Sequence, residues 1–209
     1  MRRSALIALP LLVATPLVAQ QMSKPGSKST AAISGGTYTV DPNHTLIGWR
    51  VDHLGFNDYF GIFGDTTGTL VLDPKKPNAA KVDVTIPVSK VTTASAGLTA
   101  HLLRAGKDGG KADFFGAAPA DAKFVSTSVV ATGMKAKISG NLTLNGVTKP
   151  VILNAEFSGA GKAPAMMGGK ENVGFHAKTI ILRSQFGLSF GIPVISDAVA
   201  LDITIAFQK

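Results

Sequence analysis

The sequence predicts an all-β domain, an antiparallel barrel or sandwich of about eight or nine strands with one short helix. Segments in which apolar and polar residues alternate recur along most of the chain, and this period of two is typical of half-buried strands. Residues 137–157 join two such segments through an Asn-Gly turn. Only residues 94–104, where leucines recur at helical spacing, are interpreted as a helix. An eight-stranded barrel can hold one small ligand, so this fold class allows a site in its interior.

The strongest hairpin signal is Asn145-Gly146, because both central residues of this tight turn need a positive φ. In a two-residue hairpin, the two residue numbers of every facing pair add up to the same value. Leu144 should therefore face Val147. The apolar side chains of the two strands then share one face. This face is expected to point into the core.

Other strands follow from the same alternation. They are expected at residues 38–40, 46–53, 67–72, 82–86, 124–130, 175–182 and 199–207. In the second of these, Ile47, Trp49, Val51 and His53 share one face. In the last, Asp202 lies on the polar face, which we expect to point outward.

Aromatic residues crowd a segment that we interpret as a loop. Phe56, Tyr59, Phe60 and Phe63 lie there, and a second aromatic pair follows the helical segment. Loop aromatics in a small barrel either fill the core or line an entrance to the interior. Filling of the core is the simpler interpretation.

The chain begins with the pattern of a secretory signal peptide over residues 1–19: a basic start, a short apolar run and small residues at the end. The run is too short to span a bilayer. Residues 20–36 are small, polar and aperiodic, which predicts a flexible linker. One domain, residues 37–209, remains. The chain has no cysteine, so disulfides and thiolate metal sites are excluded.

Removal of Arg2 and Arg3 with the leader leaves 19 of the 21 basic residues against 13 acidic ones, a net charge of about +6. The lysines are scattered and are not interleaved with aromatic residues, so no nucleic-acid partner is expected. Transient attraction to an anionic membrane surface is compatible with this charge. A homodimer is also compatible with the sequence.

Chemistry-bearing motifs are few. The four histidines show neither His-x-His nor His-Glu-x-x-His spacing, so we expect no metal and no cofactor, although a fold could still gather three of them. No serine lies in a Gly-x-Ser-x-Gly elbow. Asp41 and His44 could supply a carboxylate and an imidazole together, but Asp-Pro-Asn-His is first of all a turn sequence. Arg183 ends an apolar strand, where its guanidinium could cap the barrel through carbonyl groups or meet an anionic or phenolic head group.

An ordered series of short motifs runs through residues 37–209. It comprises Tyr38-Thr-Val-Asp41-Pro42-Asn-His44-Thr, Val51-Asp-His53-Leu-Gly55 with Gly61-Ile-Phe63, Ser89 to Thr93, His101-Leu102, Asp113-Phe114-Phe115, Phe124 to Ser128, Gly140 to Val151, and Arg183-Ser184-Gln-Phe186-Gly187. In this order the motifs resemble the YceI family of periplasmic polyisoprenoid-binding proteins. Gly116 and Gln185 depart from the usual family pattern, and residues 104–112 look lengthened.

The resemblance implies a lipocalin-like antiparallel β-barrel of about eight strands in the periplasm, without catalytic activity. Its interior would hold an isoprenoid lipid, such as a quinone-type or prenyl lipid. The residues that the resemblance assigns to the ligand are His44, Trp49, His53, His101, Leu102, Phe114, Phe115, Arg183 and Phe186. The departures from the pattern concern the entrance and the head group more than the fold.

Two alternatives to a lipid carrier remain at this point. An enzyme could act on a hydrophobic substrate in the same interior, using His44, His53 or His101 with Asp41. A stress-induced envelope protein with a protein partner would instead have an interior tightly packed with side chains.

Overall fold

The computed structural model describes residues 23–209, and the signal peptide predicted for residues 1–19 lies outside the described residues. Within residues 23–209 one antiparallel sheet of ten strands is accompanied by the helix α1 (Ala96–Leu102). The strands are β1 (Gly36–Val40), β2 (Leu46–His53), β3 (Asn57–Phe63), β4 (Thr67–Leu72), β5 (Lys81–Ile86), β6 (Ala122–Thr132), β7 (Lys135–Leu144), β8 (Val147–Lys162), β9 (Glu171–Leu182) and β10 (Ala198–Gln208).

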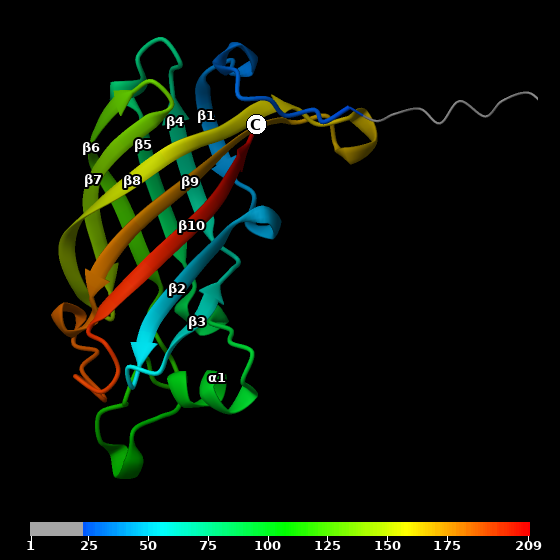
Figure 1. Cartoon of the computed structure of the whole chain (residues 1–209). Helices are drawn as coiled ribbons and strands as arrows, with labels where there is room; N and C mark the ends of the chain where they lie inside the picture. Colours follow the sequence, from blue (N-terminus) through cyan, green and yellow to red (C-terminus); the bar gives the residue numbers. More distant parts are fainter. Residues whose placement is uncertain (1–22) are drawn as a thin grey trace, which may run out of the picture.

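The sheet closes into a barrel of eight strands, β1 and β4 to β10. The spatial order runs β1-β4-β5-β6-β7-β8-β9-β10, and β1 then pairs with the end of β10 at Val40 and Phe207. The hairpin of β2 and β3 continues the wall on the same side of β10, where Trp49 pairs with Leu201. Figure 1 shows this wall wrapped around one interior. Within residues 23–209, the all-β barrel with its single short helix confirms the predicted fold class.

The two ends of the barrel differ in what covers them (Figure 1). At one end, here called the helix end, lie α1 and the segments 87–95, 103–121 and 183–197. The opposite end is formed by residues 23–35, 73–81, 133–135, 156–171 and 209, and we call it the lysine end. No helix among residues 23–209 is long and apolar enough to cross a membrane.

The predicted hairpin is present with the predicted register. Leu144 pairs with Val147 across Asn145 and Gly146, and both turn residues have a positive φ (52° and 76°). The segment of β8 from residue 147 to 153 pairs with β7 only, since pairing with β9 begins at Asn154. Pro150 therefore lies where β8 has one free edge and needs no second partner.

Residues 57–63, which we expected to be a loop, form the strand β3, so that expectation was wrong. Tyr59 and Phe63 point into the barrel, whereas Phe60 lies on the outer face with 70% of its surface exposed. Apolar side chains therefore occupy both faces of this strand, and no apolar–polar alternation marks it. Pairing with β2, at Ile47 and Phe63 among others, holds the segment extended.

Residues 23–35, which we expected to belong to a linker, run beside β8 at the lysine end. Ser27 exchanges two backbone hydrogen bonds with Ala160, at 3.0 and 2.9 Å. Ile33 is buried and belongs to the main apolar cluster. A side chain at Gly161 would collide with the Pro25 carbonyl, so the glycine allows this close approach.

Candidate functional site

A cavity of about 930 Å³ fills the interior of the barrel. Its lining extends from Ile33 and Met134 at the lysine end to His101 and Phe190 at the helix end. A volume of this size lies near the upper limit of typical small-molecule pockets, about 300–1,000 Å³. The interior is therefore an open space and is not packed solid with side chains, as the protein-partner alternative required.

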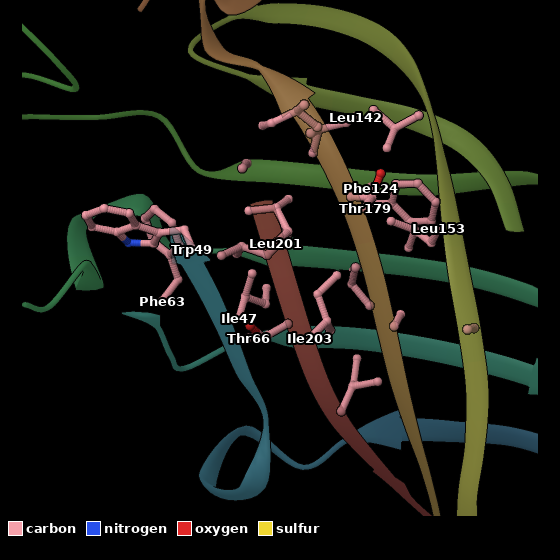
Figure 2. A pocket seen from close by; sticks show the side chains of 18 of the residues that line it. Ile47, Trp49, Phe63, Thr66, Phe124, Leu142, Leu153, Thr179, Leu201 and Ile203 are labelled. Carbon is pink, nitrogen blue, oxygen red and sulfur yellow. The ribbon is translucent and has the colours of Figure 1, made fainter. Parts of the chain in front are cut away.

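The alternation of each strand builds this cavity. Ile47, Trp49, Val51 and His53 of β2 all line it, as predicted from their shared face. Figure 2 shows inward side chains from β2, β10, β9 and β8 converging on one apolar space. Asp202 points away from it and pairs with Lys178 at 3.0 Å on the outer surface, which confirms the predicted outer face.

Three polar side chains, those of Trp49, Thr66 and Thr179, interrupt the apolar lining away from the two ends. Leu201 of β10 pairs on one side with Trp49 and on the other with Thr179, so these three residues form one row across the wall. Thr66, between β3 and β4, is fully buried. Its Oγ1 atom and the Nε1 atom of Trp49 have no hydrogen-bond partner in the protein. Figure 2 labels all three polar residues within the cavity.

At the helix end, His101 and Phe114 contribute to a cluster of rings at the boundary of the cavity. The His101 ring packs edge-on against Phe114 and Phe190, with centroid distances of 5.3 and 5.6 Å. Its Nε2 atom lies 2.7 Å from the Asp113 carboxylate, which also accepts a hydrogen bond from Arg104. Hydrogen bonds from His101 and then Arg104 lower the pKa of Asp113. The imidazole is thereby held in place from two sides.

Arg183 caps the barrel through carbonyl groups, one of the two roles considered for it. Its guanidinium donates to the carbonyl oxygens of Ser196, Leu188, Phe190 and Ile195 at 2.8–2.9 Å. The side chain is only 5% exposed, and burial lowers its pKa although the Asp197 carboxylate opposes this effect. These contacts fix the segment 183–197, so the guanidinium stabilises the wall of the site.

The nine residues assigned to the ligand fall into two groups. Seven line the cavity: Trp49, His53, His101, Leu102, Phe114, Phe115 and Arg183. His44 and Phe186 do not line it. His44 lies at the outer surface, 2.7 Å from the Asp41 carboxylate. Phe186 is buried beside the cavity wall, and its carbonyl accepts a hydrogen bond from the Asn145 amide.

Five lining residues were not assigned to the ligand from the sequence, although Tyr59 and Phe63 were considered for the core or an entrance. Tyr59, Phe63, Thr66, Thr179 and Phe190 all face the cavity. Thr179 lies in a predicted strand, so its face could have been assigned from the period of two. Thr66 and Phe190 lie outside regular structure and carry no such signal. Among residues 23–209 no three histidine or acidic side chains come together as a metal would need.

Asp41, the carboxylate of the enzyme hypothesis, does not reach the cavity. Asp41 and His44 are paired with one another, but neither residue lines the interior. The pairing instead belongs to a turn, in which Asp41 also accepts a hydrogen bond from the backbone N–H of Asn43. Of the histidines proposed for an enzyme, His53 and His101 remain at the cavity.

Comparison with known proteins agrees with this architecture. The family model described as a YceI-like domain matches residues 38–207. A UPF0312 protein of Pseudomonas fluorescens is 37% identical over 185 residues, which cover 87% of this chain and 91% of that protein. A solved Campylobacter jejuni YceI protein shares 31% identity with a TM-score of 0.61, covering 76% of this chain and 89% of the other. A polyisoprenoid binding domain from Saccharophagus degradans, 14% identical, has the same fold, with a TM-score of 0.59 and coverage of 82% and 97%.

Proposed function

The chain belongs to the YceI-like family, and from this premise we propose that it is a carrier that holds one isoprenoid lipid in its barrel. The observation that carries the proposal is the long apolar cavity of about 930 Å³. Burial of a five-carbon isoprene unit gains about 2–4 kcal/mol before ordering costs. Three or four units would support micromolar or tighter retention, so the chain of the lipid should dominate its affinity.

Membership of this family favours a binding protein over an enzyme. The cavity geometry agrees with that preference, since the Asp41–His44 pair lies outside the interior and the Arg183 guanidinium is occupied by four carbonyl groups. We therefore assign no catalytic residue. Pairing of His101 with Asp113 is interpreted as a structural contact of the helix end.

We further propose that the mature protein works in the periplasm after removal of residues 1–19, as the leader pattern predicts. Transient contact with a membrane would give the carrier access to its lipid. The distribution of charge supports such contact at the lysine end, which carries nine lysines. Cell fractionation of the full-length chain would check the location.

Native mass spectrometry with organic extraction tests the carrier function directly. Protein exported with its own leader and purified from the cell envelope should carry an isoprenoid in stoichiometric amount. In a series of added prenyl lipids, affinity should rise with each isoprene unit until the cavity is full. A protein that copurifies with no lipid and rejects every member of the series would contradict the proposal.

A pair of neighbouring variants on β10 provides the matched control. Leu201→Glu places a charge in the apolar interior, so lipid retention should be lost. Asp202→Ala changes only the outer face and should retain the lipid. Circular dichroism must show both variants folded. Equal loss of lipid in two folded variants would refute the assignment of the interior as the site.

A further inference from the structure

We infer that the cavity contains a polar subsite, to which Trp49 and Thr66 each contribute one hydrogen-bonding atom, and that this subsite selects oxygen-bearing isoprenoids over isoprenoid hydrocarbons. This inference rests on the proposed carrier function. The carrier function alone leaves the position of the polar part of the lipid open, and this subsite would fix it.

Two buried polar atoms without partners carry the inference. Thr66 is fully buried and lines the cavity, and its Oγ1 atom has no partner in the protein. Trp49 lines the cavity as well, and its Nε1 atom is buried and equally without a partner. Buried polar atoms are nearly always hydrogen-bonded in native proteins, so each exception needs an explanation. A ligand in the cavity can supply both missing bonds.

The chemistry of the two atoms defines the ligand group. The indole N–H of Trp49 can only donate a hydrogen bond, while the Thr66 hydroxyl can donate or accept one. A carbonyl, phenol or hydroxyl oxygen can bond to either atom, whereas a saturated or olefinic hydrocarbon can bond to neither. Figure 2 shows both side chains among apolar neighbours such as Ile47 and Phe63. In such surroundings a single hydrogen bond to the ligand discriminates strongly.

Charge at the cavity points to a neutral group. Among the described lining residues only Arg183 and Lys135 are permanently cationic. The Arg183 guanidinium is engaged by four carbonyls at the helix end, and Lys135 is exposed at the lysine end. A phosphate beside Trp49 and Thr66 would therefore have no free cation, which is unfavourable in an apolar interior. A quinone or prenylated phenol fits the subsite better.

The position of the indole is fixed by the strand beside it. Trp49 pairs with Gly61 of β3, and a Cβ atom at residue 61 would come within 2.5 Å of the indole Cζ2 atom. The ring therefore lies over the glycine, and the indole has one position in the wall of the cavity. A fixed donor selects by position as well as by chemistry.

Isothermal titration calorimetry with two matched probes tests the inference. The probes are a quinone with a short prenyl tail and an isoprenoid hydrocarbon of similar carbon number. Thr66→Val keeps the shape of the side chain and removes the hydroxyl, so it should weaken quinone binding about five- to tenfold. Hydrocarbon binding should stay within about twofold, and Thr66→Ser should restore quinone binding. Trp49→Phe should likewise weaken quinone binding more than hydrocarbon binding.

The outcomes separate the subsite from the carrier function. If the wild-type protein binds neither probe, the carrier function itself fails. If the wild type binds both probes and Thr66→Val weakens the binding of both equally, the subsite is refuted and the carrier function stands. The same holds if Thr66→Val weakens the binding of neither probe. Thermal unfolding without lipid provides a second readout: Thr66→Val should be at least as stable as the wild type, since it removes a buried hydroxyl that has no partner. A clear loss of stability would show that the hydroxyl serves the fold.

Discussion

Trp49 of β2 covers Gly61 of β3, and the two residues are paired across the hairpin that extends the barrel. A Cβ atom at residue 61 would lie 2.5 Å from the indole Cζ2 and 2.7 Å from the Thr92 carbonyl oxygen. These distances are far below van der Waals contact. The absence of a side chain at Gly61 thus sets the position of a tryptophan that lines the cavity.

Substitution of Gly61 by alanine should therefore disturb both stability and binding. We expect Gly61→Ala to destabilise the protein by about 1–3 kcal/mol, as overpacking does, and to weaken retention of a prenyl quinone. Gly64→Ala is the control, because its Cβ would meet only Leu46 at 3.9 Å. Urea unfolding and lipid titration measure the two effects. Equal stability of the two variants would show that the indole can move aside at little cost.

Replacement of Arg183 tests the cap of the helix end. Lysine keeps the charge but cannot reproduce a planar group that donates to four carbonyls, so Arg183→Lys should cost about 2–4 kcal/mol. Arg50→Lys alters an exposed pair with Asp58 and should cost less than about 0.5 kcal/mol. The free energy of unfolding in urea checks both. Similar small losses would mean that the segment 183–197 is held by other contacts.

Much of the barrel was predictable because most strands have one apolar and one polar face. Alternation placed Trp49 and its neighbours inside and Asp202 outside, and the Asn145-Gly146 turn fixed the register of β7 and β8. Strand β3 was missed because Phe60 and Ile62 are exposed on its outer face. Two apolar faces remove the signal on which the assignment of a half-buried strand depends.

The chemistry of the site was less predictable than its walls. The partners of Arg183 are backbone carbonyls, which leave no mark in the sequence, so its role as a cap became visible only in the folded chain. His44 lies in a motif of the resemblance, yet its side chain pairs with Asp41 at the surface. Thr66 is an ordinary residue between two strands, and only its burial beside the cavity distinguishes it.

Acid should loosen the helix end through Asp197. Hydrogen bonds from the Ser184 hydroxyl and backbone N–H, at 2.7 and 2.8 Å, lower the pKa of Asp197 below its ordinary value of 3.8. A lowered pKa in the folded state stabilises the fold above 3.8, and this contribution is lost as the pH falls below that value toward the folded pKa. Stability of the wild type should therefore decline in this window.

Asp197→Asn isolates this effect. The variant should be less stable than the wild type at neutral pH, and the difference should shrink as the pH drops below about 3.8. Asp202→Asn, on the outer face, is the control. Chemical unfolding at a series of pH values provides the measurement. A difference that stays constant down to the lowest pH would show that the Asp197 carboxylate contributes nothing to acid sensitivity.

The lysine end holds the whole net charge of the described chain. Nine lysines lie there: Lys24, Lys28, Lys75, Lys76, Lys81, Lys135, Lys162, Lys170 and Lys209. They face three acidic residues, of which Glu156 pairs with Lys28 and Glu171 accepts hydrogen bonds from Tyr38 and Ser34. The net charge of this end is thus +6, and the rest of residues 23–209 is neutral. Such a surface attracts anionic lipid head groups.

A protruding loop at this end adds apolar contact. Met166 and Met167 are 87% and 70% exposed, and Lys162 and Lys170 flank the loop that carries them. The loop is closed by a backbone hydrogen bond from Ala163 to Lys170 at 2.8 Å. Basic residues around exposed apolar side chains suit the surface of an anionic bilayer, where methionines can enter between head groups. The cavity lining also reaches this end at Ile33 and Met134.

We therefore expect the protein to sediment with vesicles that contain phosphatidylglycerol, less so with pure phosphatidylcholine, and less at high salt. At about 1 kcal/mol per lysine, the double variant Lys162→Glu and Lys170→Glu should weaken binding at least tenfold. Lys123→Glu with Lys178→Glu makes the same change of charge on the barrel wall, where both lysines pair with aspartates. If this control loses as much affinity, net charge alone drives the association. A smaller loss in the control than in the lysine-end variant locates the contact beside Met166 and Met167, at the end of the barrel where Ile33 and Met134 line the cavity.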